Sequence, residues 1–95
     1  MDFSVYILFS EKLNRYYIGQ TANVEERIKQ HNLGFYYDAS TKVSNDWKLF
    51  WCLECDSRKQ AIQIESHIKR MRNKVYYQNL VKFPEISEKL LLKFK

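Results

Sequence analysis

The sequence predicts an α+β fold in which a small three-stranded antiparallel sheet is flanked by helices. Three short runs are rich in β-branched and aromatic residues, which favour strands. The remaining segments repeat apolar residues at the spacing of one helical face, and several begin at capping residues. A chain of 95 residues is long enough for one small domain, and we expect residues 1–95 to form it.

The first two strands are expected to form a hairpin. Residues 3–9 are almost wholly apolar, and residues 16–20 follow them after a polar, turn-like segment. Residues 47–55 give the third strand, which contains Cys52 and Cys55. Positions three apart on a strand point to opposite faces, so these thiols should not converge as a metal or redox pair. We expect both to be buried, with a metal or redox role as the less favoured alternative.

The helices follow from capping and periodicity. Asn23 begins the first helix in a capping-box pattern, and Gly34 ends it. A second helix is expected over residues 57–71 and a further helical segment over residues 73–82. Pro84, at a first-turn position, opens a last short helix with one apolar face. The predicted layout is β-β-α-β-α-α, with this short segment at its end.

Charge and hydropathy limit the function classes. The chain has 16 Lys and Arg against 11 Asp and Glu, giving a net charge of +5. A small basic domain favours an acidic partner, of which nucleic acid is the commonest. No run approaches the ~20 apolar residues of a membrane span, and the N-terminus lacks a signal-peptide pattern. We therefore expect a cytoplasmic protein without a membrane partner.

Charged and polar residues interrupt two apolar helical stripes. Arg27 and His31 lie one turn apart on or beside the stripe of the first helix, and Glu65 lies between Ile64 and Ile68 on that of the second. A carboxylate there is costly unless a cation meets it. An ion pair between Glu65 and Arg27, or a position in water at the stripe edge, would explain the pattern without a function. A catalytic set is the alternative.

Two tyrosines of the hairpin complete the pattern. Tyr6 is the only phenol inside the first apolar strand, and Tyr17 precedes Gly19 in the next strand. Antiparallel pairing would bring both phenols to one surface, and the glycine would allow a backbone or ligand to approach closely. Ordinary sheet tyrosines are the structural alternative. We expect the two phenols, Arg27, His31 and Glu65 to converge on one solvent-open concavity suited to phosphodiester hydrolysis.

These residues carry a family resemblance. The chain resembles the GIY-YIG nuclease superfamily in the segments SVYIL (4–8), YIGQT (17–21), ERIKQHN (26–32), WKLFW (47–51) and SRKQAIQIESHIKR (57–70). It is most similar to small stand-alone bacterial members, which are related to the nuclease domains of excision repair and of structure-specific endonucleases. The resemblance spans about residues 3–80 and implies the GIY-YIG fold. Ser4 replaces the first glycine of the family pattern.

The resemblance implies a role for each site residue. Tyr6 would take a proton from the attacking water, and Tyr17 would orient the phosphate or the water. Arg27 would stabilise charge on the phosphate, and His31 would help proton transfer or phosphate contact. Glu65 would hold one divalent cation, Mg²⁺ or Mn²⁺. The implied activity is that of a DNA-binding, metal-dependent endonuclease in DNA repair or processing, without a small-molecule cofactor.

The expected partner is DNA, with branched or damaged forms as candidate substrates. We expect its backbone to meet Lys42, Lys69, Arg70, Arg72, Lys74 and Asn79. Asn79 is preferred over Asn73 as the counterpart of a late asparagine in the family. Two alternatives remain open: a nucleic-acid-binding module with weak or no turnover, and a protein-interaction domain with an adhesive aromatic surface.

Overall fold

The computed structural model describes residues 3–33 and 45–95. Three strands, β1 (Phe3–Ser10), β2 (Arg15–Thr21) and β3 (Lys48–Cys55), form one sheet in the order β2-β1-β3. Both pairings are antiparallel, and β1 is the central strand. The predicted hairpin and three-stranded antiparallel sheet are therefore confirmed.

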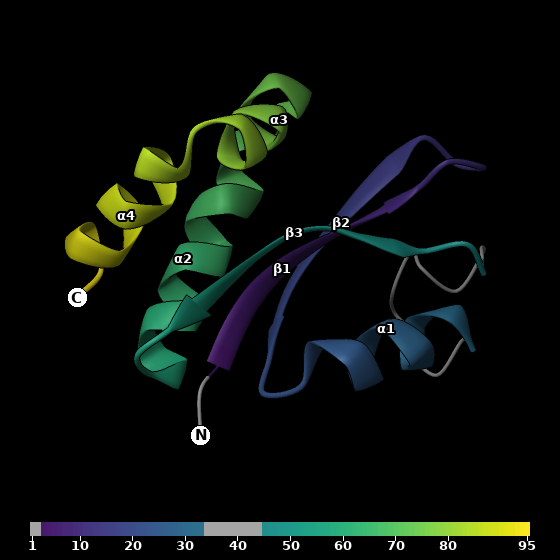
Figure 1. Cartoon of the computed structure of the whole chain (residues 1–95), viewed down its shortest axis with the longest axis horizontal. Helices are drawn as coiled ribbons and strands as arrows, with labels where there is room; N and C mark the ends of the chain where they lie inside the picture. Colours follow the sequence, from purple (N-terminus) through teal and green to yellow (C-terminus); the bar gives the residue numbers. More distant parts are fainter. Residues whose placement is uncertain (1–2, 34–44) are drawn as a thin grey trace.

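Helices cover both faces of this sheet (Figure 1). Helix α1 (Val24–Asn32) lies on one face, and α2 (Arg58–Met71), α3 (Lys74–Lys82) and α4 (Pro84–Lys93) lie on the other. The segments on either side of Phe83 form separate helices, as expected for residues 73–82 and for the short helix that Pro84 opens, although the layout β-β-α-β-α-α counted only three helices. The expected end of the first helix, Gly34, lies outside the described residues.

Side-chain caps fix where the helices begin. The Asn23 side chain accepts a hydrogen bond from the Glu26 N–H at 3.1 Å, and Ser57 accepts one from the Gln60 N–H at 3.1 Å. Each bond satisfies a backbone donor that has no partner within its own helix. Both predicted starts are therefore confirmed. Pro84 occupies the first turn of α4, where its missing N–H costs nothing.

Gln60 also joins α2 to its surroundings. Its Oε1 accepts from the Asp56 N–H at 2.7 Å, and its Nε2 donates to the Leu91 carbonyl of α4 at 3.0 Å. The side chain is buried, so both halves of the amide have the partners that burial requires. This residue holds α4 against the beginning of α2.

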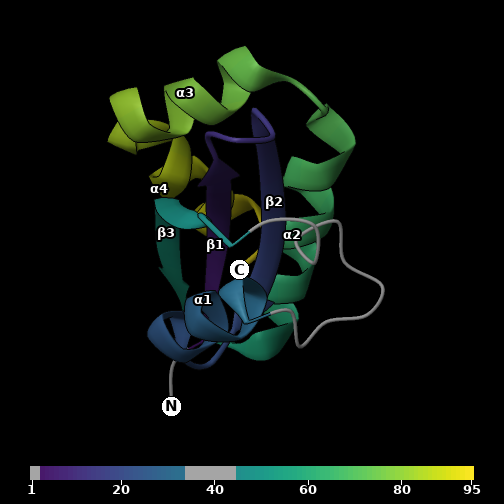
Figure 2. The ribbon, with the colours of Figure 1, turned by 90° about the vertical axis from the view of Figure 1, so that its right-hand side faces the viewer.

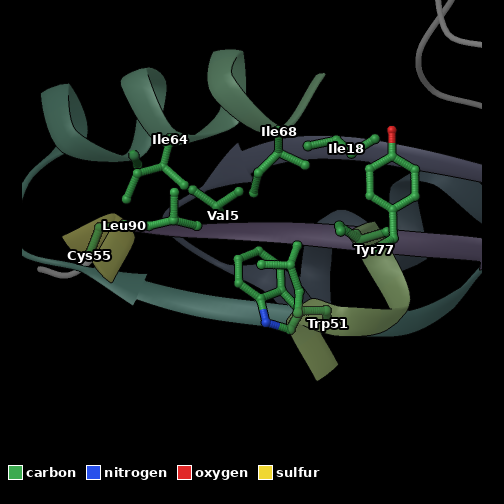
Figure 3. Close-up of a cluster of buried hydrophobic side chains, with 11 residues drawn as sticks. Val5, Ile18, Trp51, Cys55, Ile64, Ile68, Tyr77 and Leu90 are labelled. Carbon is green, nitrogen blue, oxygen red and sulfur yellow. The ribbon is translucent and has the colours of Figure 1, made fainter. Parts of the chain in front are cut away.

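Alternation along the strands divides the core in two. On the face of α2, Val5 and Ile18 pack with Ile64 and Ile68, as Figure 3 shows, together with residues of α3 and α4. On the face of α1, Tyr6, Leu8 and Trp47 form a second buried cluster, against which residues of α1 pack. Burial on both faces explains why β1 reads as an almost continuous apolar run.

Asn32 at the end of α1 is tied to the beginning of β3. Its Nδ2 donates to the Trp47 carbonyl at 3.0 Å, and its Oδ1 accepts from the Trp47 N–H at 2.8 Å. Trp47 is itself almost fully buried. These two bonds hold the last turn of α1 against the sheet. They therefore fix the distance between the sheet and the preceding residue, His31.

The cysteines differ in environment. Cys55 is buried, but Cys52 is exposed, so the expectation that both are buried is wrong for Cys52. Its strand position faces away from the cluster that holds Cys55, as the three-residue spacing requires. Among residues 3–33 and 45–95, no helix has the length and hydropathy needed to cross a membrane.

Candidate active site

Strand register places the two phenols together. Tyr6 is paired with Gly19, and Leu8 with Tyr17, so the two tyrosines are diagonal neighbours on one face of the sheet. Their ring centroids are 6.4 Å apart. The prediction that hairpin pairing brings both phenols to one surface is confirmed.

Gly19 makes room for the Tyr6 ring. A Cβ atom at Gly19 would lie 2.5 Å from the Tyr6 Oη and 2.7 Å from its Cζ. Ordinary van der Waals contact begins near 3.4 Å, so any larger residue would push the phenol aside. The close approach expected at this glycine is therefore made by the neighbouring tyrosine, whose ring crosses the glycine backbone.

His31 completes a three-ring cluster. Its Nε2 lies 3.1 Å from the Tyr6 Oη, within hydrogen-bond distance. Its ring centroid is 4.7 Å from that of Tyr17 and 6.1 Å from that of Tyr6. Tyr6 and His31 are 0% exposed, whereas Tyr17 is half-buried. The expected solvent-open concavity is thus wrong for Tyr6 and His31, which are enclosed between the sheet and α1.

Burial decides the charge of the imidazole. Desolvation, and secondly the positive charge of Arg27, lower the pKa of His31 from 6.5 to about 4. His31 is therefore neutral at pH 7, and its ring can orient the Tyr6 hydroxyl through one nitrogen. Transfer of a proton from an ordinary phenol (pKa ~10) to such an imidazole is uphill by roughly 8 kcal/mol. A positioning role thus suits this histidine better than that of a base.

A hollow of about 330 Å³, here named the edge hollow, lies beside the end of β2. It is lined from α1 by Arg27 and from the first residue of α2 by Arg58, so one arginine from each of two helices borders the same space. Because the charge of Arg27 also acts on His31, this residue links the hollow to the three-ring cluster. Phe3, Gln20 and Glu26 also line it.

Glu65 lies at the edge of the α2 stripe, where its side chain is 18% exposed. Its carboxylate pairs with Lys69 Nζ at 2.6 Å, one turn along the same helix. The hypothesis of an ion pair between Glu65 and Arg27 is therefore wrong. Lys69 is half exposed, and such an i, i+4 pair stabilises a helix by only ~0.3–0.5 kcal/mol.

The flank of α2 that carries Glu65 is turned away from the C-terminal helices. His67, on the opposite flank, makes ring contacts with Tyr76 of α3 and Phe94 at the end of α4. Arg58 lies two helical turns before Glu65, which places both on the same flank. Helix α2 runs beside β2 in Figure 2, and of this flank Arg58 lines the hollow whereas Glu65 does not.

Comparison with known proteins agrees with this arrangement. The GIY-YIG catalytic domain model matches residues 2–79. The chain belongs to the GIY-YIG family. The solution NMR structure of the UPF0213 protein BH0048 from Bacillus halodurans is similar, with 26% identity, a TM-score of 0.52, and coverage of 86% of this chain and 84% of that one. No curated protein matches this sequence.

The expected site residues of this family member do not all lie together. The GIY-YIG superfamily consists of nuclease domains that act on nucleic acid. In this member, Tyr6, Tyr17 and His31 are together, and Arg27 adjoins them. Glu65 is on α2, which packs on the opposite face of the sheet from the phenols, so the expectation that it converges with them on one concavity is wrong. Gln20, which directly follows Gly19 and lines the hollow, was not among the predicted site residues.

The expected DNA contacts have different structural roles. Lys69, Arg70 and Lys74 are exposed near the junction of α2 and α3. Arg72 ends α2 in the left-handed region, with φ 44°. The Asn73 side chain caps α3 by accepting from two backbone N–H groups, whereas Asn79 is half-buried on α3. Lys42 lies outside the described residues.

The donor set for a metal ion is small. Within the described parts of the chain, no three His, Cys, Asp or Glu side chains gather into a metal-binding group. Two carboxylates of the described residues come into question: Glu26, which is exposed and lines the hollow, and Glu65, which is partly exposed on α2. Mg²⁺ commonly binds through one or two carboxylates, retained waters and substrate phosphates. One carboxylate therefore fits an ion that binds together with the nucleic acid.

Proposed function

We propose that this GIY-YIG protein is a divalent-metal-dependent endonuclease that hydrolyses a phosphodiester bond in DNA. The observation that carries the proposal is the Tyr6–Tyr17–His31 cluster with Arg27 at its border. A phenol pair, a neutral imidazole and a guanidinium supply hydrogen bonds and positive charge where an attacked phosphate needs them. We also take residues 1–95 as one domain, because Leu90 of α4 is buried in the same core as residues of α2.

Within the proposed site, the two phenols have different tasks. Tyr17 is half-buried and can meet a phosphate oxygen or the attacking water. Tyr6 is fully buried, and its hydroxyl lies against His31, so it acts on the water through the cluster or after a local opening. His31 stays neutral and fixes the direction of the Tyr6 O–H bond. Hydrogen bonds of this kind are effective where water is excluded.

Arg27 provides the positive charge of the proposed site. A guanidinium recognises two phosphate oxygens at once and remains protonated at all physiological pH values. Arg27 lies one helical turn before His31 on α1 and its charge acts on that ring, which supports a shared role of both residues on one phosphate. We therefore assign to Arg27 the stabilisation of negative charge that builds up on the phosphate during attack.

Glu65 is the residue that would hold the metal ion, Mg²⁺ or Mn²⁺. When bound, such an ion supplies Lewis-acid stabilisation of the leaving oxygen. The Glu65 carboxylate is otherwise shared with Lys69, a weak and solvent-screened partner. Loss of that pair costs little, so the carboxylate is available to a cation that binds with the substrate.

Contacts to the DNA backbone would come from the junction of α2 and α3. Lys69, Arg70, Arg72 and Lys74 lie close together in the sequence there and present four positive charges. Such contacts position a duplex without reading its sequence. Lys42 and Asn79 complete the proposed set, and the polyanion is consistent with the net charge of +5. A role in DNA repair or processing, on branched or damaged DNA, follows as part of the proposal.

A cleavage panel tests the proposal. Branched, flapped, nicked and single-stranded DNAs are incubated with the protein in Mg²⁺, Mn²⁺ or EDTA. We expect cleavage of at least one DNA, dependent on metal. The matched control is Tyr17→Phe, which removes one hydroxyl from a half-buried ring, leaves the fold intact and should lower the rate by at least tenfold. No cleavage with any DNA, or equal rates for Tyr17→Phe, would refute the proposal.

A further inference from the structure

The edge hollow is lined by a second arginine, beyond the one that the proposed attacked phosphate requires. Arg58 of α2 shares it with Arg27, yet it belongs to neither the three-ring cluster nor the basic junction of α2 and α3. Among the residues that the structure describes, no carboxylate pairs with Arg58. Two arginines and one glutamate, Glu26, give the charged lining a net charge of +1, from 2 − 1. The hollow thus favours an anion.

Gln20 adds a second, independent sign of a ligand. Its Oε1 atom is buried and has no hydrogen-bond partner in the described part of the chain. A buried acceptor without a donor costs about 1–3 kcal/mol, and native proteins leave few of them. Because Gln20 lines the hollow, a rotation of its side chain toward the hollow would let a group that enters supply the missing donor.

The size of the hollow fits a nucleotide unit. Its volume of about 330 Å³ is at the lower end of the ~300–1,000 Å³ that ligand sites occupy. Phe3 gives it an apolar part against which a sugar or base can pack. Since Arg27 borders both the hollow and the three-ring cluster, a strand whose attacked phosphate lies at the cluster leads directly into the hollow.

We infer that the edge hollow is a subsite for a second phosphate of the nucleic-acid strand, next to the one that is cut, with Arg58 as its main ligand. This inference rests on the proposed function. Arg58 donates to the phosphate oxygens, and Gln20 Oε1 accepts from a hydroxyl or amino group of the same nucleotide. Glu26 opposes the anion and limits its affinity, so that the strand can leave after cleavage.

DNA binding measured in EDTA, where no metal-dependent cleavage can occur, tests the subsite independently of catalysis. Fluorescence anisotropy is measured with the fluorescein-labelled DNA that binds best, carrying a neutral methylphosphonate at one position at a time. For the wild type, one methylphosphonate should weaken binding about tenfold, the loss expected of one charge-assisted contact. For Arg58→Gln, the unmodified DNA should bind about tenfold more weakly, and that same methylphosphonate should cost nothing further.

Matched variants exclude a general charge effect. Lys59→Gln removes the same charge from an exposed neighbour outside the lining and should keep the full methylphosphonate penalty. Glu26→Gln should bind a few-fold more tightly. Gln20→Met removes the unpaired acceptor at similar size, so it should weaken binding while leaving the melting temperature unchanged or higher.

The results that overturn the inference differ from those that overturn the nuclease activity. Wild-type affinity in Arg58→Gln, an unchanged methylphosphonate penalty in that variant, or a sensitive phosphate more than two nucleotides from the mapped cut would each refute the subsite. If Arg58→Gln abolishes the penalty of one methylphosphonate but the protein cuts no DNA, Arg58 binds a phosphate. That phosphate is then not next to a cleaved bond, and the subsite as inferred is refuted. The cleavage panel alone decides that second question.

Discussion

Gly19→Ala is expected to disrupt the candidate active site from a residue that has no reactive group. The added methyl would lie 2.5 Å from the Tyr6 Oη, 2.7 Å from Cζ and 3.1 Å from Cε1. Tyr6 is fully buried and lies within hydrogen-bond distance of His31, so its ring cannot move out into solvent without losing this contact. The phenol must tilt, and the bond to the imidazole must lengthen or break.

The expected loss in the free energy of unfolding has two contributions. Overpacking a buried site by one methyl destabilises by ~1–3 kcal/mol, and loss of one buried hydrogen bond adds ~0.5–1.5 kcal/mol. We therefore expect a loss of roughly 2–4 kcal/mol in the free energy of unfolding. For a chain of this length, that lowers the melting temperature by roughly 10–25 °C. Urea unfolding followed by circular dichroism measures the loss directly.

A double-mutant cycle with Tyr6→Phe identifies the cause. The phenylalanine lacks the Oη atom that makes the shortest contact, but its ring still meets the new methyl at the former Cζ position. Gly19→Ala should thus cost less in the Tyr6→Phe background, by about 1 kcal/mol. If Gly19→Ala leaves stability within ~0.5 kcal/mol of the wild type, or costs the same in both backgrounds, the packing of Tyr6 over Gly19 is wrong.

Three further predictions concern pH, salt and the C-terminal helix. The pKa of His31 is lowered to about 4 in the native state, so between about pH 4 and 6.5 the unfolded chain binds more protons. Stability should be complete above pH 6.5 and fall toward pH 4. His31→Gln should flatten that part of the thermal-melting curve more than His67→Gln does, and equal curves for wild type and His31→Gln would contradict this. Replacing Lys69, Arg70 and Arg72 together by Gln should weaken DNA binding alike for unrelated sequences and reduce the slope of log K against log salt by about 2–3. An unchanged slope would mean that these charges do not meet phosphate. Leu90→Ala should destabilise by ~2–5 kcal/mol in urea unfolding, because Leu90 is 5% exposed. The control Leu92→Ala, at 70% exposed, should have little effect, and equal losses would show that α4 is not part of the core.

Much of the fold could be predicted because its signals are local. Capping at Asn23 and Ser57 depends on residues three positions apart, and both helix starts are confirmed. Strand pairing of the first two runs follows from a short polar turn, which also places Tyr6 beside Tyr17. Such features require no knowledge of distant contacts.

Features that depend on tertiary packing could not be predicted. Periodicity places Glu65 on the apolar stripe, but only the arrangement of α3 and α4 decides that its flank is at the stripe edge. The enclosure of Tyr6 and His31 depends on α1 closing over the sheet. The edge hollow unites Arg27 with Arg58, two residues on different helices. No sequence spacing encodes that proximity.

The central claim, metal-dependent cleavage that depends on Glu65, is tested most directly by comparing wild type with Glu65→Gln under single-turnover conditions. The amide keeps the shape of the side chain and removes its charge, and the lost pair with half-exposed Lys69 contributes little to stability. We expect cleavage in Mg²⁺ to be abolished, while the affinity for DNA stays within a few-fold and the melting temperature is unchanged. Cleavage by Glu65→Gln at the wild-type rate would show that the metal is held elsewhere and would contradict the proposed site.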